Sequence, residues 1–435
     1  MSYQQAIGYL YGLQQHGMKF GLDNIRTLMS IFGNPHHAFR SVHVAGTNGK
    51  GSTSAMIESI LRTSGVRTGL FTSPHLLSFT ERIRINGEET GEDEVIALAE
   101  EVKSAAGKIE DFSPTFFEVV TAMAFLHFRN KGVEWAVVET GLGGRLDATN
   151  VIVPEVSVIT RIGLDHCDFL GSTLAEIAKE KAGIIKEGVS VVSADHEAEA
   201  LDVIVAKSAG KHSALHTFGK EFTAGLVAES FGGITLHYSG NGDYRDLRVP
   251  LPGSYQMVNA SLALKTIEVI SSKFPGLRFD IRKGLTDVRW PGRLELVKDD
   301  PPVLIDAAHN PQASLALSDH LKKIVLARYR RIILVIGAMG DKDIDGILGP
   351  LLPLAAEILF AAPAYGRAAS PERLAAAAAK MGYPSIVAQS VAGAIVKAEE
   401  LQRPGDLILI TGSFYTIGEA KEFLGGKGVL TRLRE

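Results

Sequence analysis

Hydrophobic and polar positions along this chain follow two alternating periods from Ser41 onward. Short runs rich in β-branched residues are each followed by a Gly-containing turn and a longer segment with an amphipathic, helical period. We expect buried strands at residues 41–45, 135–139 and 156–160, and a helix over residues 51–64. This alternation is typical of βα units, so the fold class is predicted to be α/β with a mainly parallel sheet.

The pattern changes twice farther along the chain. Residues 218–252 contain short alternating segments rich in Gly, Asn and Asp, which predict a small β excursion. Near Trp290 the helical pattern stops and a new βα series begins. We therefore predict two domains, residues 1–290 and residues 291–435, the second being a smaller Rossmann-like α/β domain. Its strands are expected at residues 303–307, 332–336, 357–361 and 407–411.

Composition places the chain among soluble globular proteins. Of its 435 residues, 46% are hydrophobic and 22% charged, and the net charge of −4 comes from interspersed acidic and basic residues. This pattern gives no basic footprint for nucleic acid or for an anionic membrane. The apolar stretch at residues 344–363 is broken by charges and prolines, so it predicts a core helix and strand rather than a membrane span. We see no secretory signal, assign no role to the single cysteine, Cys167, and expect a cytoplasmic monomer.

A glycine-rich loop follows the first predicted strand and runs directly into a predicted helix. Glycines let the backbone turn its N–H groups toward an oxyanion, the helix N-terminus adds a positive dipole end, and Lys50 can reach terminal phosphates. The usual pattern has Gly at the position of Val44 and Ser or Thr at the position of Gly51, so Ser52 or Thr53 must supply the hydroxyl. The loop predicts nucleotide binding, and the plainer alternative is a turn that only joins a strand to a helix. The predicted phosphate-binding residues are Gly46, Thr47, Asn48, Gly49, Lys50, Gly51 and Ser52.

An ordered series of motifs extends over nearly the whole chain. They are residues 44–52 (VAGTNGKGS), 72–76 (TSPHL), 81–87 (ERIRING), 139–150 (ETGLGGRLDATN), 162–166 (IGLDH), 180–186 (EKAGIIK), 291–295 (PGRLE) and 306–311 (DAAHNP). The series resembles the Mur ligase superfamily and, within it, the dihydrofolate synthase/folylpolyglutamate synthase family. The resemblance implies an N-terminal P-loop domain and a C-terminal domain with ATP between them, Mg²⁺ at the phosphates and glutamate as the incoming amine.

The implied activity is ATP-dependent ligation of L-glutamate to dihydropteroate, giving dihydrofolate, and to folyl(poly)glutamate. The reaction would pass through an acyl phosphate and release ADP and phosphate, with dihydropteroate, reduced folates and L-glutamate as the small-molecule partners. Cell-wall relatives carry a UDP-binding domain ahead of the ATPase domain, and the 45 residues before Gly46 are too few for one. Residues 141–150 look like the bifunctional bacterial form. One alternative is folylpolyglutamate synthase activity alone, and another, of a different class, is a P-loop ATPase or switch without ligase activity.

Formation of an acyl phosphate brings two anions together, so the reaction needs cations and donors. Glu139 ends an apolar strand, where a carboxylate is costly unless it meets a cation. The resemblance implies that Glu139 and Ser73 bind Mg²⁺ at the phosphates and that His166 binds at a second Mg²⁺. Mg²⁺ favours oxygen ligands, so His166 has an alternative role in orienting substrate or a metal-bound water. Plainer alternatives are a turn cap for Ser73 and a core hydrogen bond for His166.

Further nucleotide contacts are implied by the resemblance around the predicted domain junction. Asn259 matches an adenine-binding Asn, and Arg293 matches a phosphate contact. Asp306 and His309 match residues that hold the ribose and phosphate side from the C-terminal domain. The plainer readings are a helix N-cap for Asn259, a surface salt bridge for Arg293 and a helix cap for Asp306. The loop at residues 337–343 (GAMGDKD) receives no role.

Lys181 lies on a predicted helix opened by a capping box, Thr173 to Glu176. It falls seven residues after Leu174 on the apolar stripe, whereas Lys179 lies off the stripe, so its amine is expected to be at least partly buried. Burial favours the neutral amine, which can react with carbon dioxide to give a carbamate. The family's modified lysine occupies the matching position, and the alternative is a lysine whose ammonium reaches water. The predicted catalytic residues are therefore Lys50, His166 and Lys181.

Overall fold

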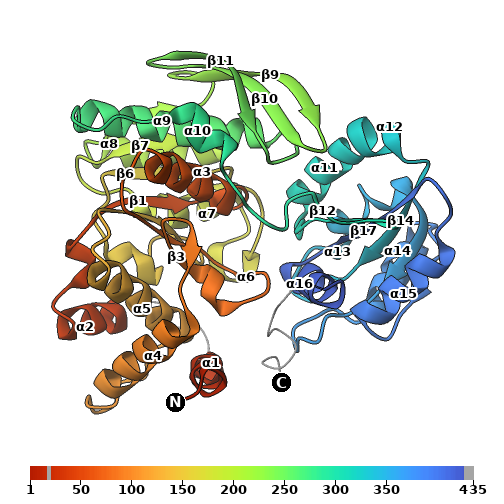
Figure 1. Ribbon diagram of the computed structural model, residues 1–435, viewed down its shortest axis with the longest axis horizontal. Coiled ribbons are helices and arrows are strands. Elements are labelled where there is room, and N and C mark those ends of the chain that lie inside the picture. The colour runs from red at the N-terminus through yellow and green to blue at the C-terminus, as the bar shows by residue number, and fades with distance from the viewer. Residues whose placement is uncertain (17–20, 426–435) are drawn as a thin grey trace.

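An eight-stranded sheet, with strand order β4-β3-β2-β5-β1-β6-β7-β8, forms the centre of the first part of the chain (Figure 1). The computed structural model describes residues 1–16 and 21–425. Strand β1 pairs in parallel with β5 and β6, while β3 and β4 at one edge run antiparallel. The strands are β1 (Arg40–Ala45), β2 (Thr68–Phe71), β3 (Ile83–Ile85), β4 (Glu88–Glu89), β5 (Trp135–Glu139), β6 (Val156–Ile159), β7 (Ser190–Ser193) and β8 (Leu215–Thr217). The predicted α/β class and mainly parallel sheet are confirmed.

The central strands are buried along almost their whole length because helices cover both faces of the sheet. Strand β5 is buried at every position, and β1 is buried at every position after Arg40. In the register of these two strands Val44 lies opposite Glu139. The loop that follows β1 and the carboxylate that ends β5 therefore leave the sheet at the same edge.

Two groups of helices cover this sheet, one on each face. Helices α3 (Lys50–Thr63), α9 (Gln256–Lys273) and α10 (Ile281–Thr286) pack on one face. The opposite face is covered by α1 (Tyr3–Gly12), α2 (Asp23–Ile31), α4 (Glu92–Ala106) and α5 (Phe116–Asn130). Helices α6 (Cys167–Leu170), α7 (Leu174–Lys181) and α8 (Ala198–Ala209) build a smaller core beside β6 and β7.

A separate antiparallel sheet stands on α9, as the predicted excursion at residues 218–252 required. Its strands are β9 (Thr223–Ser230), β10 (Gly233–Ser239) and β11 (Asp243–Val249), in the order β11-β10-β9. The sheet is fastened to α9 by Glu268, which accepts hydrogen bonds from the Tyr238 hydroxyl at 3.0 Å and from the Gly242 backbone at 2.9 Å. Lys265 lies 3.1 Å from the same carboxylate, and both side chains are buried.

The second part of the chain is built on a six-stranded sheet with order β12-β13-β17-β14-β15-β16. Only the pairing of β12 with β13 is antiparallel among the described strands of this sheet. The strands are β12 (Glu295–Asp299), β13 (Pro302–Ile305), β14 (Arg331–Ile336), β15 (Ala355–Phe360), β16 (Ile386–Val387) and β17 (Asp406–Thr411). We call the part on the eight-stranded sheet the first lobe and this part the second lobe.

Helices cover both faces of the second sheet as well. One face carries α11 (Pro311–His320), α12 (Leu326–Arg328), α13 (Ile344–Leu348) and α14 (Pro371–Lys380), and the other carries α15 (Val391–Leu401) and α16 (Phe414–Phe423). Ser370 caps α14 and Pro371 opens it. Short 3₁₀ turns lie at Leu13–His16, Pro35–His37, Phe79–Arg82, Ala148–Val151, Ala182–Ile184 and Leu352–Leu354, and a π-helical segment at Leu321–Val325.

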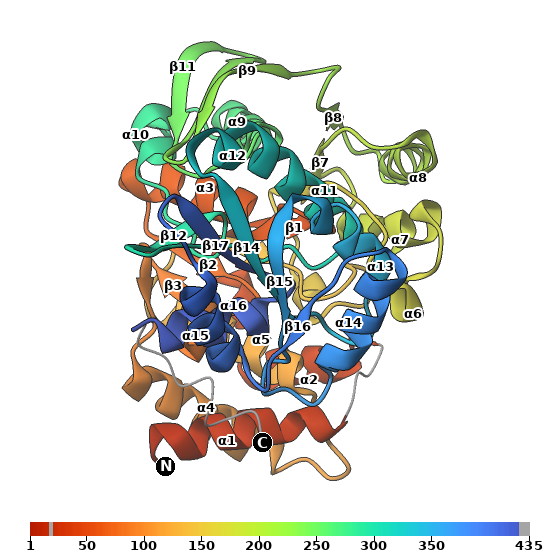
Figure 2. The ribbon, with the colours of Figure 1, turned by 90° about the vertical axis from the view of Figure 1, so that its right-hand side faces the viewer.

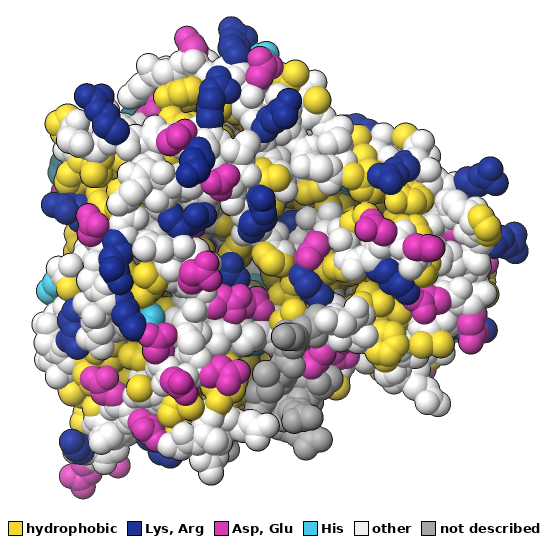
Figure 3. Space-filling model, viewed as in Figure 1, with side chains coloured by type: hydrophobic (Ala, Val, Ile, Leu, Met, Phe, Trp, Pro, Cys, Tyr) yellow, Lys and Arg dark blue, Asp and Glu magenta, His cyan; other side chains and the backbone are white. Residues whose placement is uncertain are grey.

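The lobes lie side by side and are joined by the segment between α10 and β12 (Figure 1). Figure 2 views the molecule from the side of the second lobe, which lies in front of the first. Among the described helices, none has the length and apolar character to cross a membrane. On the face shown in Figure 3, acidic and basic side chains are interspersed, as the composition suggested.

We predict that Glu268→Ala lowers the free energy of unfolding by about 3 kcal/mol, because it leaves the buried Lys265 ammonium without its carboxylate. Urea denaturation followed by circular dichroism measures the change. The control is Glu400→Ala, which removes an exposed ion pair with Lys397 and should change the free energy by less than about 0.5 kcal/mol. Equal unfolding midpoints for the two variants would contradict the anchoring role of Glu268.

Candidate functional site

A cavity of about 1360 Å³ lies between the two lobes. It is lined by the loop after β1, the end of β5, the segment before α6 and the turns that follow β13 and β17. These are the carboxyl ends of parallel strands, where open α/β sheets place their ligands. Every residue that the sequence nominated for the site lines this cavity: Gly46, Thr47, Asn48, Gly49, Lys50, Gly51, Ser52, Ser73, Glu139, His166, Lys181, Asn259, Arg293, Asp306 and His309.

The glycine-rich loop is a close-packed turn in which two glycines are indispensable. Gly46 and Gly49 have φ values of 149° and 95°, in the region that favours glycine. A Cβ on Gly46 would lie 1.8 Å from Thr160 Oγ1, and one on Gly49 would lie 2.3 Å from Asn259 Oδ1. The loop ends where α3 begins at Lys50, so the helix N-terminus faces the cavity. This geometry suits the binding of a phosphate group.

The hydroxyl next to the loop comes from Ser52 rather than Thr53. Ser52 lines the cavity and accepts a long hydrogen bond of 3.4 Å from the Gln256 amide. The Thr53 hydroxyl is fully buried and has no partner among the described residues. Asn259 lies inside α9, which begins at Gln256, so it is not the N-cap that a plainer reading allowed.

Two ammonium groups meet at one backbone carbonyl of the loop. Lys50 Nζ donates to the Gly46 oxygen at 3.2 Å and to the Thr47 oxygen at 3.3 Å, and Lys181 Nζ donates to the Gly46 oxygen at 2.8 Å. Lys181 is only 4% exposed, so its predicted burial is confirmed. Its ammonium does not reach water along the helix surface, and the alternative of an outward-reaching lysine is wrong.

The surroundings of Lys181 favour its neutral form. Burial, together with the charge of Lys50, lowers the pKa of the Lys181 ammonium to about 7. The predicted capping box is present at the start of α7, with Thr173 accepting from the Glu176 backbone. Lys179, two positions earlier on the helix, is exposed. Helix α7 therefore places Lys181 in the cavity wall and leaves Lys179 exposed.

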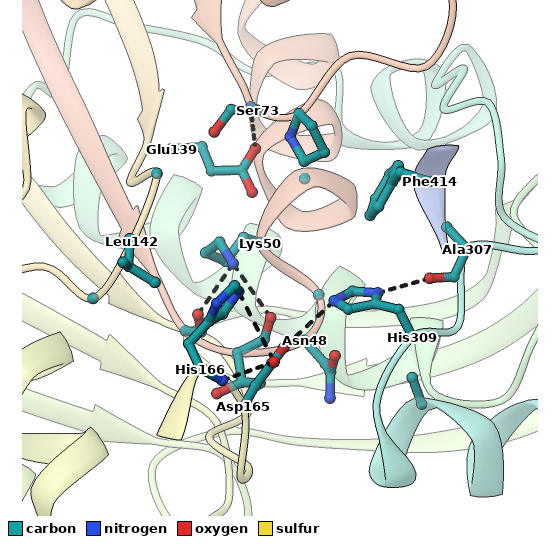
Figure 4. Close-up of a pocket in the computed structure, with 18 of the residues that line it drawn as sticks. Asn48, Lys50, Ser73, Glu139, Leu142, Asp165, His166, Ala307, His309 and Phe414 are labelled. Carbon is teal, nitrogen blue, oxygen red and sulfur yellow. Dashed lines mark hydrogen bonds and ion pairs between the residues drawn. The ribbon is translucent and has the colours of Figure 1, made fainter. Parts of the chain in front are cut away.

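The Glu139 carboxylate is buried at the end of β5, beside Ser73 (Figure 4). Burial raises its pKa to about 7, although the Lys50 charge, the Ser73 N–H at 3.2 Å and the Arg293 charge oppose the rise. A cation close to this carboxylate would relieve the cost of burial. The oxygens of Glu139 and Ser73 fit a hard cation such as Mg²⁺, which takes few protein ligands and completes its shell with phosphate oxygens and water.

His166 has different surroundings. Its Nε2 lies 3.4 Å from the Lys342 ammonium, and burial lowers its pKa to about 4. Within residues 1–16 and 21–425, no group of three or more His, Cys, Asp and Glu side chains could hold a metal ion. With an ammonium beside its imidazole, His166 does not fit the expected second Mg²⁺ in this arrangement of the lobes.

Asp165 connects the two lobes, and our reading of the sequence gave it no role (Figure 4). Its carboxylate lies 2.5 Å from Lys342 Nζ and 3.4 Å from His309 Nε2, and it accepts a hydrogen bond of 3.2 Å from the Asn310 amide. Asn310 also donates to Asn48 of the loop at 3.0 Å. The unassigned loop at residues 337–343 therefore contributes a cation to the contact between the lobes.

These contacts determine the charge of Asp165. Burial alone would raise its pKa, but the hydrogen bond and charge of His309, with the charges of His166 and Lys342, outweigh burial and hold the pKa well below its ordinary value. Asp165 is thus a stable anion of the first lobe that faces the Lys342 ammonium and the His309 imidazole of the second. A single sequence contains no signal that pairs positions 165 and 342, because they are far apart along the chain.

The second lobe supplies a turn that presents His309 and Arg293 to the cavity. Both carboxylate oxygens of Asp306 accept backbone hydrogen bonds, from Leu294 at 3.0 Å and Ala308 at 2.9 Å, so Asp306 holds this turn in place. His309 Nδ1 donates to the Ala307 carbonyl at 2.8 Å, which directs Nε2 toward Asp165. The Arg293 guanidinium lies 4.8 Å from the ring centre of Phe414.

Aromatic residues line another arm of the cavity, and the motifs did not single them out. Phe116 stacks on Tyr11 with ring centres 5.4 Å apart, and the Arg82 guanidinium lies 5.3 Å from the centre of the Phe116 ring. Across the cavity, Tyr365 stacks on Tyr415 at 4.2 Å. The wall residues of this arm come from both lobes, and its rings suit a flat conjugated ligand.

The fold and the site define the class of protein. Residues 44–267 match the Mur ligase middle domain, and residues 292–414 match the Mur ligase glutamate ligase domain. The chain belongs to the Mur ligase family.

Individual relatives narrow the comparison. The chain is 38% identical to a dihydrofolate synthase/folylpolyglutamate synthase of Bacillus subtilis, across 97% of this chain and 99% of the relative. It is similar to the structure of Mycobacterium tuberculosis folylpolyglutamate synthase complexed with ADP, with a TM-score of 0.90 and 35% identity over 98% of this chain and 100% of that one. Escherichia coli FolC in complex with DHPP and ADP gives a TM-score of 0.86 and 32% identity, covering 97% of each chain.

We predict that Asp165→Asn loosens the contact between the lobes, because the nearly buried Lys342 ammonium and the His309 imidazole lose their common anion, at a cost of about 3 kcal/mol to this contact. Small-angle X-ray scattering should show a larger radius of gyration for the variant. Asp195→Asn is the matched control, since Asp195 forms a half-exposed ion pair with Arg161 within the first lobe. Identical scattering from all three proteins would argue against a bridging role for Asp165.

Proposed function

We propose that this protein is an ATP-dependent ligase that joins L-glutamate to dihydropteroate and to folyl(poly)glutamate, with an acyl phosphate as intermediate. The observation that carries the proposal is the cavity itself, which joins a phosphate cradle on the first lobe to Arg293 and His309 on the second. The B. subtilis relative matches this chain over nearly its full length, and its name contains both dihydrofolate synthase and folylpolyglutamate synthase, which supports the choice of substrates. The chain divides into functional units at residues 290 and 291, with the nucleotide between them.

Residues of both lobes are proposed to bind the nucleotide. The loop from Gly46 to Ser52 holds the phosphates, and Asn259 faces the base across Gly49. Arg293 contacts phosphate, and His309, on the turn held by Asp306, closes the site from the second lobe. ADP in the complexes of the relatives from M. tuberculosis and E. coli supports this placement.

Each step of the reaction moves one group. A carboxylate oxygen of the substrate bonds to the γ-phosphorus of ATP while the bond to the β–γ bridging oxygen breaks and ADP leaves. The glutamate nitrogen then bonds to the acyl carbon, phosphate leaves and the nitrogen loses a proton. Lys50 and the N-terminus of α3 offset the charge that develops on the phosphoryl oxygens.

One Mg²⁺ ion fits the residues present. Glu139 and Ser73 would hold it, and it supplies positive charge where the two anions meet. The buried carboxylate, whose pKa is raised to about 7 by burial, is the group that such an ion would keep ionised. The proposal contains no second Mg²⁺ at His166, because the Lys342 ammonium lies 3.4 Å from its imidazole.

The aromatic arm is the proposed site for the pterin and aminobenzoyl rings. Arg82, Phe116 and Tyr415 line it and can stack on flat conjugated rings or face their polar edges. The arm opens into the same cavity as the phosphate loop, so the substrate carboxylate can reach the γ-phosphate. DHPP in the E. coli complex supports a pterin ligand.

Lys181 is proposed to carry a carbamate. Its neutral amine would bond to the carbon of carbon dioxide and release a proton, which leaves an anion beside the Lys50 ammonium. The change replaces repulsion between the buried Lys181 ammonium and the half-buried Lys50 ammonium with attraction between opposite charges. The short distances from both lysines to the Gly46 oxygen, 2.8 and 3.2 Å, support the proposal.

The first prediction from this proposal concerns the products. With ATP, Mg²⁺ and L-glutamate, the protein should convert dihydropteroate to dihydrofolate and should extend a reduced folate by one glutamate, both detected by mass spectrometry with ADP release. Extension of the folate alone would reduce the function to folylpolyglutamate synthase. ATP hydrolysis that ignores glutamate and both substrates would indicate an ATPase or switch instead.

Two variants test whether one site serves both substrates. Lys50→Ala should lose at least about 100-fold in turnover with either substrate while keeping its circular dichroism spectrum, because it removes one charge at the phosphates. Glu139→Ala should lose both activities together. Loss of one activity only would show that the two reactions use separate centres.

The second prediction concerns Lys181. Lys181→Ala should lose most ligase activity and regain part of it with added formate or acetate, whereas Lys179→Ala, on the exposed face of the same helix, should be nearly unchanged. With ¹³C-labelled carbon dioxide, the carbamate signal should grow as pH rises through about 7, because the lowered pKa of Lys181 makes the neutral amine available there. Full activity of Lys181→Ala, or no labelled signal at pH 8, would exclude the carbamate.

A further inference from the structure

The departure of the phosphate loop from its usual pattern has a steric cause. Gly51 stands where such loops normally place Ser or Thr. A Cβ on Gly51 would lie 2.7 Å from Cζ2 and 2.9 Å from Nε1 of the Trp290 indole. Distances below about 3 Å are not tolerated between carbon atoms in close-packed structures. The indole ring therefore occupies the space that a Ser or Thr side chain would need.

Trp290 lies in the segment that joins the two lobes. Helix α10 ends at Thr286 and β12 begins at Glu295, so Trp290 stands midway in the connection. The ring is partly buried against the core that contains α3 and α9. Arg293, three positions later, lines the cavity from the second lobe. Trp290 thus contacts the first turn of α3 and is separated from Arg293 by only two residues of the connection.

The indole has a second neighbour besides Gly51. The Arg84 guanidinium lies 5.6 Å from the ring centre. Arg84 is itself held by the Glu81 carbonyl at 3.2 Å and the Glu89 carboxylate at 3.5 Å. The adjacent small cavity measures about 20 Å³, roughly room for one water molecule. The ring thus lies beside Gly51 and Arg84, and Trp290 also borders the large cavity.

We propose that Trp290 is a positioning residue that couples the phosphate loop to the connection between the lobes. Its indole holds the first turn of α3 through Gly51, so a nucleotide on the loop and the placement of Arg293 depend on the same ring. This inference rests on the nucleotide site proposed above. It explains why glycine follows Lys50 in a loop that otherwise retains its phosphate cradle.

The test is a double-mutant cycle on ADP affinity, measured by isothermal titration calorimetry. Gly51→Ala in the otherwise unchanged protein should weaken ADP binding roughly tenfold or more, because the new methyl group overlaps the indole. In the Trp290→Ala background, the same Gly51→Ala change should cost less than about twofold, because the space is then open. If Gly51→Ala weakens ADP binding equally in the two backgrounds, Trp290 does not position the loop through Gly51.

Gly49→Ala is the matched control. Its new Cβ would meet Asn259 rather than the indole, at 2.3 Å from Oδ1, so its effect on ADP binding should be the same with Trp290 or Ala at position 290. Rescue of Gly49→Ala by Trp290→Ala would show a general loosening of the loop and would overturn a specific contact. Trp290→Phe, which keeps an aromatic ring, should give an intermediate Gly51→Ala cost and provides the cycle if Trp290→Ala does not fold.

Fluorescence supplies a readout that a purely structural role would not change. The chain has two tryptophans, and the other, Trp135, is buried in β5. In Trp135→Phe, all tryptophan emission comes from Trp290, and saturating ADP should shift its maximum or intensity. Unchanged emission with ADP bound, as calorimetry verifies, would overturn the coupling. Failure of the unchanged protein to bind ADP would instead overturn the proposed nucleotide site itself.

In steady state, Trp290→Phe should raise the KM for ATP several-fold more than it lowers kcat, since the ring positions the loop and does not touch the reacting atoms. A several-fold fall in kcat with an unchanged KM for ATP would place Trp290 in the chemical step and would overturn the positioning role.

Discussion

The Gly46 carbonyl oxygen is the point on which the site depends, because it holds two ammonium groups that would otherwise repel each other. Lys50 and Lys181 both donate to it, at 3.2 and 2.8 Å. Concentrated positive charge in a buried place is costly unless anions arrive to offset it. The cost appears as the lowered pKa of Lys181, and the proposed phosphate and carbamate would each relieve it. The same charge supports the proposal that the loop binds the phosphates of a nucleotide.

The rest of the first lobe supports this concentration of charge. Parallel pairing of β1 with β5 brings Glu139 to the edge where the loop begins. Glycine at positions 46 and 49 lets the loop pass close to Thr160 and Asn259, and glycine at position 51 leaves room for the Trp290 ring. Each of these close contacts restricts the conformations that the loop backbone can adopt. A loop fixed in this way needs little rearrangement when a phosphate binds, which is the basis of electrostatic preorganisation.

The second lobe completes the site through charge, while Leu76 and Phe231 of the first lobe make apolar contacts with its cores. Asp165 collects Lys342, His309 and Asn310 from that lobe on one carboxylate. A buried anion shared by several donors gives orientation, since each donor must be placed to reach it. The lobes are therefore held in register by polar contacts at the same cavity where the chemistry is proposed. Movement of one lobe would change the surroundings of the phosphates directly.

The sequence by itself determined the features that arise from neighbouring residues. Alternating periods predicted the α/β fold, Gly and Lys spacing predicted the phosphate cradle, and the capping box with its apolar stripe predicted the burial of Lys181. Only the tertiary structure decided the pairing of Asp165 with Lys342, the contact of Trp290 with Gly51 and the aromatic arm around Phe116. Those partners are distant along the chain, and their meeting depends on how sheets and helices pack in three dimensions. Caps and periodicity act within a few residues and can be recognised locally, whereas long-range contacts leave no such local pattern.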